Sequence, residues 1–322
     1  MRVKENITQQ NGTIKNSAIS TIFSQYWLFT VVVCSILSLI GNTLLILIVY
    51  RNKRLHTTPN YIIVNMAVSD LFTPLYAYFL FPNVVAAISR NSSANFLSFM
   101  CKVGYFLTNV SNKVSMISLV IITVHRFCAV VCPLKARLKR KRLNVVLLLG
   151  TWIVPIVAYL IMLEPVLFKV DILMCQPIRW LYMFYIFCFD MIIVVSSFAI
   201  ILVMYPVILV KLVTEPMPDS FKSYAAQRRQ HNVNLTKMFV MMIVVFTMTV
   251  CNFQVSKLIL WISKPNDFRD LLMYNFIVAP FPCIFHAINP AICFAFSSFY
   301  RRGIKQIFSC CRGAAVGNHF FL

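Results

Sequence analysis

Residues 27–50, WLFTVVVCSILSLIGNTLLILIVY, form a long run without a single charged side chain. About 20 such residues in a helix cross the roughly 30 Å hydrocarbon core of a membrane, so this run is long enough to span one. Lipid offers no hydrogen-bond partners, and a spanning backbone must therefore satisfy its own polar groups, which a helix does. The run predicts a membrane-spanning helix.

Six further apolar blocks of similar length follow the first, and the composition of the whole chain agrees with this pattern. The chain is 60% hydrophobic and 12% charged, whereas soluble domains are about half apolar and about a quarter charged. Strands of a membrane barrel would be about 10 residues long and alternating. We therefore expect an all-α membrane protein, a bundle of seven transmembrane helices with spans at residues 27–50, 61–88, 103–124, 143–163, 180–210, 238–256 and 271–300.

The net charge of +21 would suggest a nucleic-acid partner in a soluble protein. Here the basic residues instead collect in alternate connections between the blocks, and this placement excludes that interpretation. By the positive-inside rule these connections are cytoplasmic and the N-terminus is extracellular. The cytoplasmic basic stretches are expected at residues 51–54, 126–142, 211–237 and 301–312.

The first 26 residues are polar and contain no apolar segment of the kind that signal peptides carry. We expect residues 1–26 to form an extracellular N-terminal segment, with the first span as the membrane-inserting signal. Three glycosylation sequons fall on the side that is expected to be extracellular. They begin at Asn6, Asn11 and Asn91.

Short motifs stand in a fixed order along the blocks, and together they identify a family. They resemble those of the rhodopsin-like (class A) G-protein-coupled receptors over residues 26–311. The resemblance implies a plasma-membrane receptor that converts ligand binding outside into activation of a heterotrimeric G protein inside. It is carried by Gly41-Asn42, Asn65-Met66-Ala67-Val68-Ser69-Asp70, His125-Arg126-Phe127, Trp152, Tyr205 and Asn289-Pro290-Ala291-Ile292-Cys293.

The resemblance also narrows the range of expected ligand classes. Thr108 stands where amine-binding relatives have an aspartate, and Cys283 stands where opsins have their retinal lysine. We therefore expect neither a monoamine nor retinal, and a peptide is the preferred ligand class. Each candidate contact is equally well interpreted as a helix–helix hydrogen bond. The candidates are Thr108, Asn109, Asn112, Lys113, Asp190, Gln254 and Lys257.

Two further sites follow from the family pattern. Cys101 and Cys175 would form the disulfide that ties the second extracellular loop over the cavity; the alternative is two free thiols. Asp70 is a carboxylate in mid-span, where a functional role is the default. With Ser115 and Asn289 it resembles a sodium-binding site, and the alternative is a protonated side chain that serves packing alone.

The residues that switch such receptors are partly altered. Arg126 implies G-protein contact, with Tyr205, Asn289 and Pro290 as further switch residues, but His125 replaces the usual acidic neighbour of Arg126. The restraining salt bridge of many relatives therefore cannot form, and we expect raised basal signalling. Other family positions are changed too, namely Val250, Asn252 and Cys293.

Lys113 is an ammonium group within a span, and three interpretations stay open. It pairs with Asp190, which the resemblance places on a facing helix; it contacts the ligand; or it is neutral or reaches the membrane surface.

After the seventh span, Tyr300, Ile304, Ile307 and Phe308 recur at helical spacing opposite basic residues. This predicts an amphipathic helix on the inner leaflet, in contact with membrane lipids. Cys310 and Cys311 follow as palmitoylation candidates or simply exposed thiols. The expected division is an extracellular segment at residues 1–26, a receptor domain at 27–298, and the amphipathic helix and tail at 299–322.

Two rival functions remain. A transporter or channel would use Asp70, Lys113, Asp190 and His286 as a relay. A receptor-like protein that binds ligand without signalling would explain the altered switch motifs. We find no catalytic constellation in the sequence, so no enzyme is expected, and sodium at Asp70 is the only expected cofactor.

Overall fold

The computed structural model describes residues 2–72, 94–132, 141–161, 166–169, 174–177, 180–214, 222–263 and 280–313. The chain in these ranges is helical apart from one short hairpin and a few turns. The helices are α1 (Arg2–Arg51), η1 (Lys53–Leu55), α2 (Thr58–Asp70), α5 (Ala94–Val131), α7 (Lys141–Leu160), α8 (Trp180–Thr214), α9 (Lys222–Ser263), α11 (Pro280–Phe296) and α12 (Ser298–Gly313).

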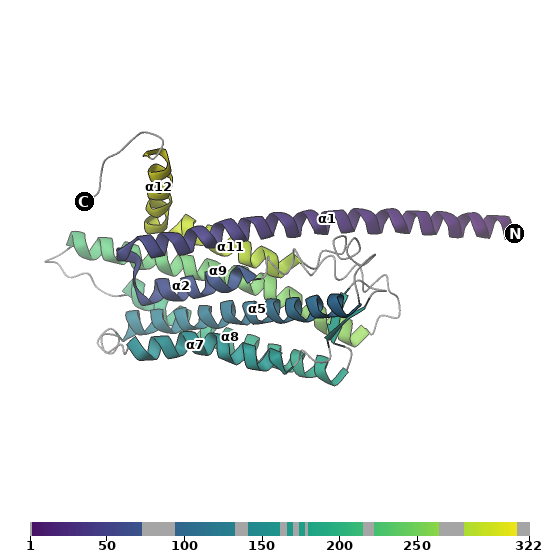
Figure 1. Ribbon diagram of the computed structural model, residues 1–322. Helices are drawn as coiled ribbons and strands as arrows, with labels where there is room; N and C mark the ends of the chain where they lie inside the picture. Colours follow the sequence, from purple (N-terminus) through teal and green to yellow (C-terminus); the bar gives the residue numbers. More distant parts are fainter. Residues whose placement is uncertain are drawn as a thin grey trace.

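The long helices run side by side in one bundle, and α12 stands crosswise at one end of it (Figure 1). Helix α5 contacts α2, α7 and α8, whereas α1 packs against α2 and α11. The bundle therefore places α5 among α2, α7 and α8, and α11 between α1 and α9.

Five helices in the described ranges are long and apolar enough to cross a membrane. A sixth span is reached if α11 and α12, which meet at a bend of 99°, are taken together. Of the second predicted block, α2 shows only the first part, and the remainder lies outside the described residues. The spans are Phe29–Arg51, Lys102–Val131, Leu143–Leu160, Phe184–Leu212 and Val233–Val250.

Large apolar side chains lie on both the inside and the outside of the bundle, as a lipid environment requires. Met242 and Ile208 have no exposed surface, while Leu202 and Ile192 expose 68% and 67% of theirs. In water such an outer surface would be an aggregation hazard. In a bilayer it is the natural face of a spanning helix.

Two element boundaries differ from the sequence-based expectation. Helix α1 begins at Arg2 rather than near residue 27, and its polar first half projects beyond the bundle (Figure 1). No proline precedes Pro59 to interrupt it. The seventh span, expected to reach residue 300, ends at Phe296, and Tyr300 lies in α12 after the bend.

A β-hairpin was not predicted. Strand β1 (Val166–Lys169) pairs antiparallel with β2 (Met174–Pro177), and Phe168 faces Cys175 in the register. Both strands contact α5. Four-residue strands in a connection carry too weak an alternation to be recognised beside the long apolar blocks.

Two glycines allow helices to approach closely. A Cβ added to Gly41 of α1 would lie 2.9 Å from Pro290 of α11, and one added to Gly303 of α12 would collide with Ile48 of α1. A Cβ at Gly150 of α7 would meet nothing within 4 Å. Gly41 and Gly303 therefore require the absence of a side chain, whereas Gly150 does not.

Candidate functional site

Asp70, at the last turn of α2, is the centre of a buried polar cluster, and it has no exposed surface. The hydroxyl of Ser115 on α5 donates to its Oδ1, and Asn289 Nδ2 on α11 donates to its Oδ2 at 3.0 Å. The structure thus brings together the three residues that the sequence grouped as an ion or polar site.

His286 completes this cluster, although from the sequence it is expected only as part of the relay of a transporter or channel. Its Nδ1 lies 2.6 Å from Asp70 Oδ1, and its Nε2 lies 2.8 Å from Oδ1 of Asn112 on α5. His286 and Asn289 are three residues apart on α11, which places both on one helix face. That spacing was the signal that could have found it. Asn112, a ligand candidate, points instead into this cluster.

The cluster is extended by side chains of α1, α2 and α5. Ser69 and Ser115 share a hydrogen bond of 2.8 Å, and Ser111 donates to the carbonyl of Ser69 at 2.5 Å. On the other side, Asn42 Nδ2 donates to Ser38 Oγ at 3.1 Å. Four helices therefore meet in one network around a single carboxylate.

Asn42 also donates to a backbone carbonyl of α11 that lacks its helical hydrogen bond. Proline has no N–H, so Pro290 leaves the carbonyl four residues earlier, that of His286, without its helical donor. Asn42 Nδ2 donates to this carbonyl at 3.2 Å. The Gly41-Asn42 pair thus makes two contacts with α11. Gly41 leaves room for the Pro290 ring, and Asn42 donates to the carbonyl that Pro290 leaves without a helical partner.

Sodium binding at Asp70 stays a prediction, and the side chains bonded to this carboxylate are hydrogen-bond donors. Both oxygens of Asp70 already accept hydrogen bonds from protein groups. A hard cation is instead held by several oxygens whose lone pairs face it.

Lys113 and Asp190 form a second buried pair. Lys113 Nζ lies 2.7 Å from Asp190 Oδ1, with side-chain exposures of 6% and 1%. The hydroxyl of Tyr159 on α7 donates to the same oxygen at 2.5 Å. The ring of Tyr159 in turn meets that of Phe189 edge-on, with centroids 5.7 Å apart. Of the three interpretations of Lys113, the structure shows the pairing with Asp190.

Arg126, near the opposite end of α5, is surrounded differently. Its guanidinium carbon lies 5.2 Å from the centre of the Phe239 ring of α9, a cation–π arrangement. In the part of the chain that the structure describes, no carboxylate pairs with Arg126. Tyr205 of α8, one of the predicted switch residues, is buried in the main core.

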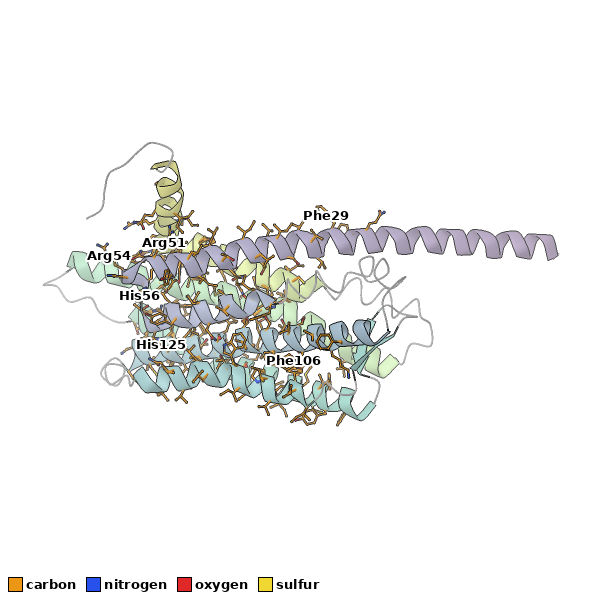
Figure 2. All side chains as sticks on the ribbon, viewed as in Figure 1. Phe29, Arg51, Arg54, His56, Phe106 and His125 are labelled. Carbon is orange, nitrogen blue, oxygen red and sulfur yellow. The ribbon has the colours of Figure 1, made fainter. Side chains whose placement is uncertain are left out.

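The ends of the bundle differ in charge. Arg51, Arg54, His56 and His125 lie at the same end as α12 (Figure 2), and Phe106 and Phe29 lie toward the other end. On α12 itself the side chains of Arg301, Arg302 and Lys305 are exposed. Tyr300 is buried, and its hydroxyl donates to Asn60 at 2.9 Å. The predicted amphipathic helix is therefore present.

The contact between two motif residues, Asn65 and Trp152, was also not predicted from the sequence. Trp152 Nε1 on α7 donates to Asn65 Oδ1 on α2 at 2.8 Å. Asn65 Nδ2 donates to Ser118 on α5 at 3.0 Å and to Thr151 on α7 at 3.1 Å. One amide thus joins three helices, whereas the sequence presented Asn65 and Trp152 as separate family markers.

Several predicted site residues stay predictions. Thr108 is half-buried, and its hydroxyl has no partner among the described residues, whereas Asn109 has one. Strand β2, which carries Cys175, contacts the helix that carries Cys101, but neither side chain is described. Also outside the described side chains are Asn6, Asn11, Asn91, Asn252, Gln254, Lys257, Cys310 and Cys311.

The family is settled by comparison with known proteins. Residues 41–292 match the family described as "7 transmembrane receptor (rhodopsin family)". The chain belongs to this family. The seven-helix fold class and the resemblance to peptide-receptor members of class A are thereby confirmed. The chain is a multi-pass membrane protein, and its family is one of receptors rather than enzymes.

The similar proteins of this family include receptors with peptide names. Neuropeptide FF receptor 2 of Mus musculus is 33% identical over 138 residues, covering 42% of this chain and 31% of the relative. Somatostatin receptor type 1 of Rattus norvegicus is 28% identical over 273 residues, 81% of this chain and 66% of the relative. Cholecystokinin receptor type A of Oryctolagus cuniculus is 32% identical over 120 residues, 36% of this chain and 27% of the relative. The matches thus span between about a quarter and two thirds of the length of these relatives.

Proposed function

We propose that this receptor transduces the binding of an extracellular peptide into activation of a heterotrimeric G protein. The observation that carries the proposal is the contact of Arg126, which follows His125 directly in the sequence, with an aromatic ring rather than a carboxylate. A guanidinium without an ionic partner is available to exchange contacts when the helices separate. The relatives named for neuropeptide FF, somatostatin and cholecystokinin support a peptide as the ligand class.

In this proposal the receptor sits in the plasma membrane with its N-terminus outside and α12 on the inner leaflet. The basic end then faces anionic lipid headgroups and the G protein, which suits the positive-inside rule. Glycosylation at Asn6, Asn11 and Asn91, a Cys101–Cys175 disulfide and palmitoylation at Cys310 and Cys311 belong to the same proposal.

The test is nucleotide exchange on purified G proteins by the receptor in membranes, screened with a library of extracellular peptides. The expected result is exchange that at least one peptide raises and that Arg126→Ala abolishes. Leu202→Ala is the control, because Leu202 lies on the outer surface of α8 with 68% of its surface exposed, and it should leave the peptide response intact. A response that survives Arg126→Ala would contradict the assigned role of Arg126.

The same membranes also test the transporter rival. Its four relay residues are divided in the structure into two pairs, Asp70–His286 and Lys113–Asp190. Vesicles that hold the purified receptor should show no ion flux above empty vesicles. Flux that depends on Asp190 and persists without any G protein would favour the rival.

A further inference from the structure

The Asp70 cluster differs from an ion site in one decisive way, because it contains its own nitrogen donor. We infer that the imidazole of His286 takes the place of sodium as the partner of Asp70, so that the polar centre of this receptor does not respond to sodium. The inference concerns an ion effect on stability and does not depend on which ligand or G protein the receptor uses.

The first argument is the placement of the two ring nitrogens. Nδ1 faces a carboxylate oxygen at 2.6 Å and Nε2 faces an amide oxygen at 2.8 Å. An ionised carboxylate only accepts hydrogen bonds, so the bond between Nδ1 and Asp70 Oδ1 requires a hydrogen on Nδ1. The ring therefore places a donor against the oxygen that a bound cation would need.

The second argument is burial. Neither side chain of the Asp70–His286 pair has any exposed surface. An unpaired carboxylate at this depth would cost several kcal/mol, whereas a carboxylate with hydrogen-bonded partners is tolerated. The partner is covalently attached to α11, so it is present at every sodium concentration.

The third argument is that few side-chain oxygens of the cluster lack a hydrogen-bond partner. Ser115 directs its hydrogen at Asp70 and also bonds Ser69, and Asn289 presents its N–H to Asp70. Among the side chains of this cluster, Asn289 Oδ1 is the oxygen without a partner. One such oxygen does not make the shell of several oxygens that a hard cation requires.

The arrangement also decides which helices are tied together. Asp70 lies on α2, Asn112 on α5 and His286 on α11. A diffusible ion could leave when these helices rearrange. His286 is part of α11 and moves with it. The three helices are therefore coupled by a side chain rather than by an ion.

The experiment compares thermal unfolding of the purified receptor in sodium chloride and in potassium chloride at equal ionic strength. For the unaltered receptor we expect the same Tm in both salts. His286→Ser removes the internal partner, which lowers Tm in potassium and opens the carboxylate to an ion. In this variant we expect sodium to raise Tm by about 3 °C over potassium at ten times its dissociation constant.

The control is Asp70→Asn in the His286→Ser background, which removes the carboxylate and should remove the sodium response. The inference is overturned if the unaltered receptor is stabilised by sodium over potassium. It is equally overturned if the His286→Ser variant is as insensitive to sodium as the unaltered receptor. Should His286→Ser not fold, His286→Asn retains a hydrogen-bonding group and is judged by the same two outcomes, with the unaltered receptor deciding alone if neither is recovered.

Discussion

Buried charged side chains have different kinds of partner in the centre of the bundle and at its basic end. In the centre, Asp70 and Asp190 each have a basic partner and at least one further donor. At the basic end, Arg126 lies against the ring of Phe239, with no carboxylate paired to it in the described ranges. The receptor is thus held by specific polar contacts in the middle and by weaker, less directional ones at the end where we propose that the G protein binds.

The largest expected effect comes from breaking a pair in the centre. Lys113→Met leaves the Asp190 carboxylate buried without its ammonium partner, and such losses cost about 3–5 kcal/mol. We expect little folded receptor at the cell surface, measured by surface labelling and by Tm in detergent. Lys237→Met, at an exposed position on α9, is the matched control and should be neutral.

A charge exchange then separates pairing from mere burial. Lys113→Glu alone should lose surface expression, and adding Asp190→Lys should restore it. A double variant as poorly expressed as the single one would show that the orientation of the pair, and with it the Tyr159 contact, matters more than charge balance.

Glycine substitutions compare the two regions by packing alone. Gly41→Ala, near the polar centre, and Gly303→Ala, at the basic end, each force a Cβ onto a neighbouring side chain. Overpacking of this kind costs about 1–3 kcal/mol, visible as a lower Tm. Gly150→Ala meets open space and should be neutral or stabilising, since alanine favours a helix. Equal Tm for all three variants would disprove the close approach of the helices.

The Arg126–Phe239 contact predicts a smaller effect on signalling. A cation–π contact is worth about 0.5–2 kcal/mol, so Phe239→Ala should raise basal nucleotide exchange several-fold by releasing α5 from α9. Phe239→Trp keeps an aromatic face and should retain the original basal rate. Basal exchange no higher than in membranes without receptor would contradict the expectation of weak restraint.

The smallest expected effect is at the junction of α12. Tyr300→Phe removes the hydrogen bond to Asn60 without changing shape, which costs about 0.5–1.5 kcal/mol. Tyr26→Phe alters a side chain that is 73% exposed and should leave Tm unchanged. If the two variants behave alike, the Tyr300–Asn60 bond does not hold α12 in place.

The sequence predicted the spans because lipid imposes long apolar blocks, and the structure describes most of them as helices. It grouped Asp70 with Ser115 and Asn289 and offered Asp190 to Lys113 only through family resemblance, since neither pairing follows from spacing along one helix. It could not place His286 beside Asp70, because that contact depends on the rotation of α11 relative to α2. It also could not foresee the hairpin or the length of α1, where weak local preferences are decided by what surrounds them.

The contacts of Gly41 and Asn42 with α11 have a mechanical consequence. Because one residue fits the Pro290 ring and the next holds the carbonyl of His286, α1 and α11 should move as one rigid body. A spectroscopic probe on the outer surface of α1 would then serve as a fixed reference frame. Distances from it to the cytoplasmic half of α9 would report the movement of α9 alone, free of motion in α11.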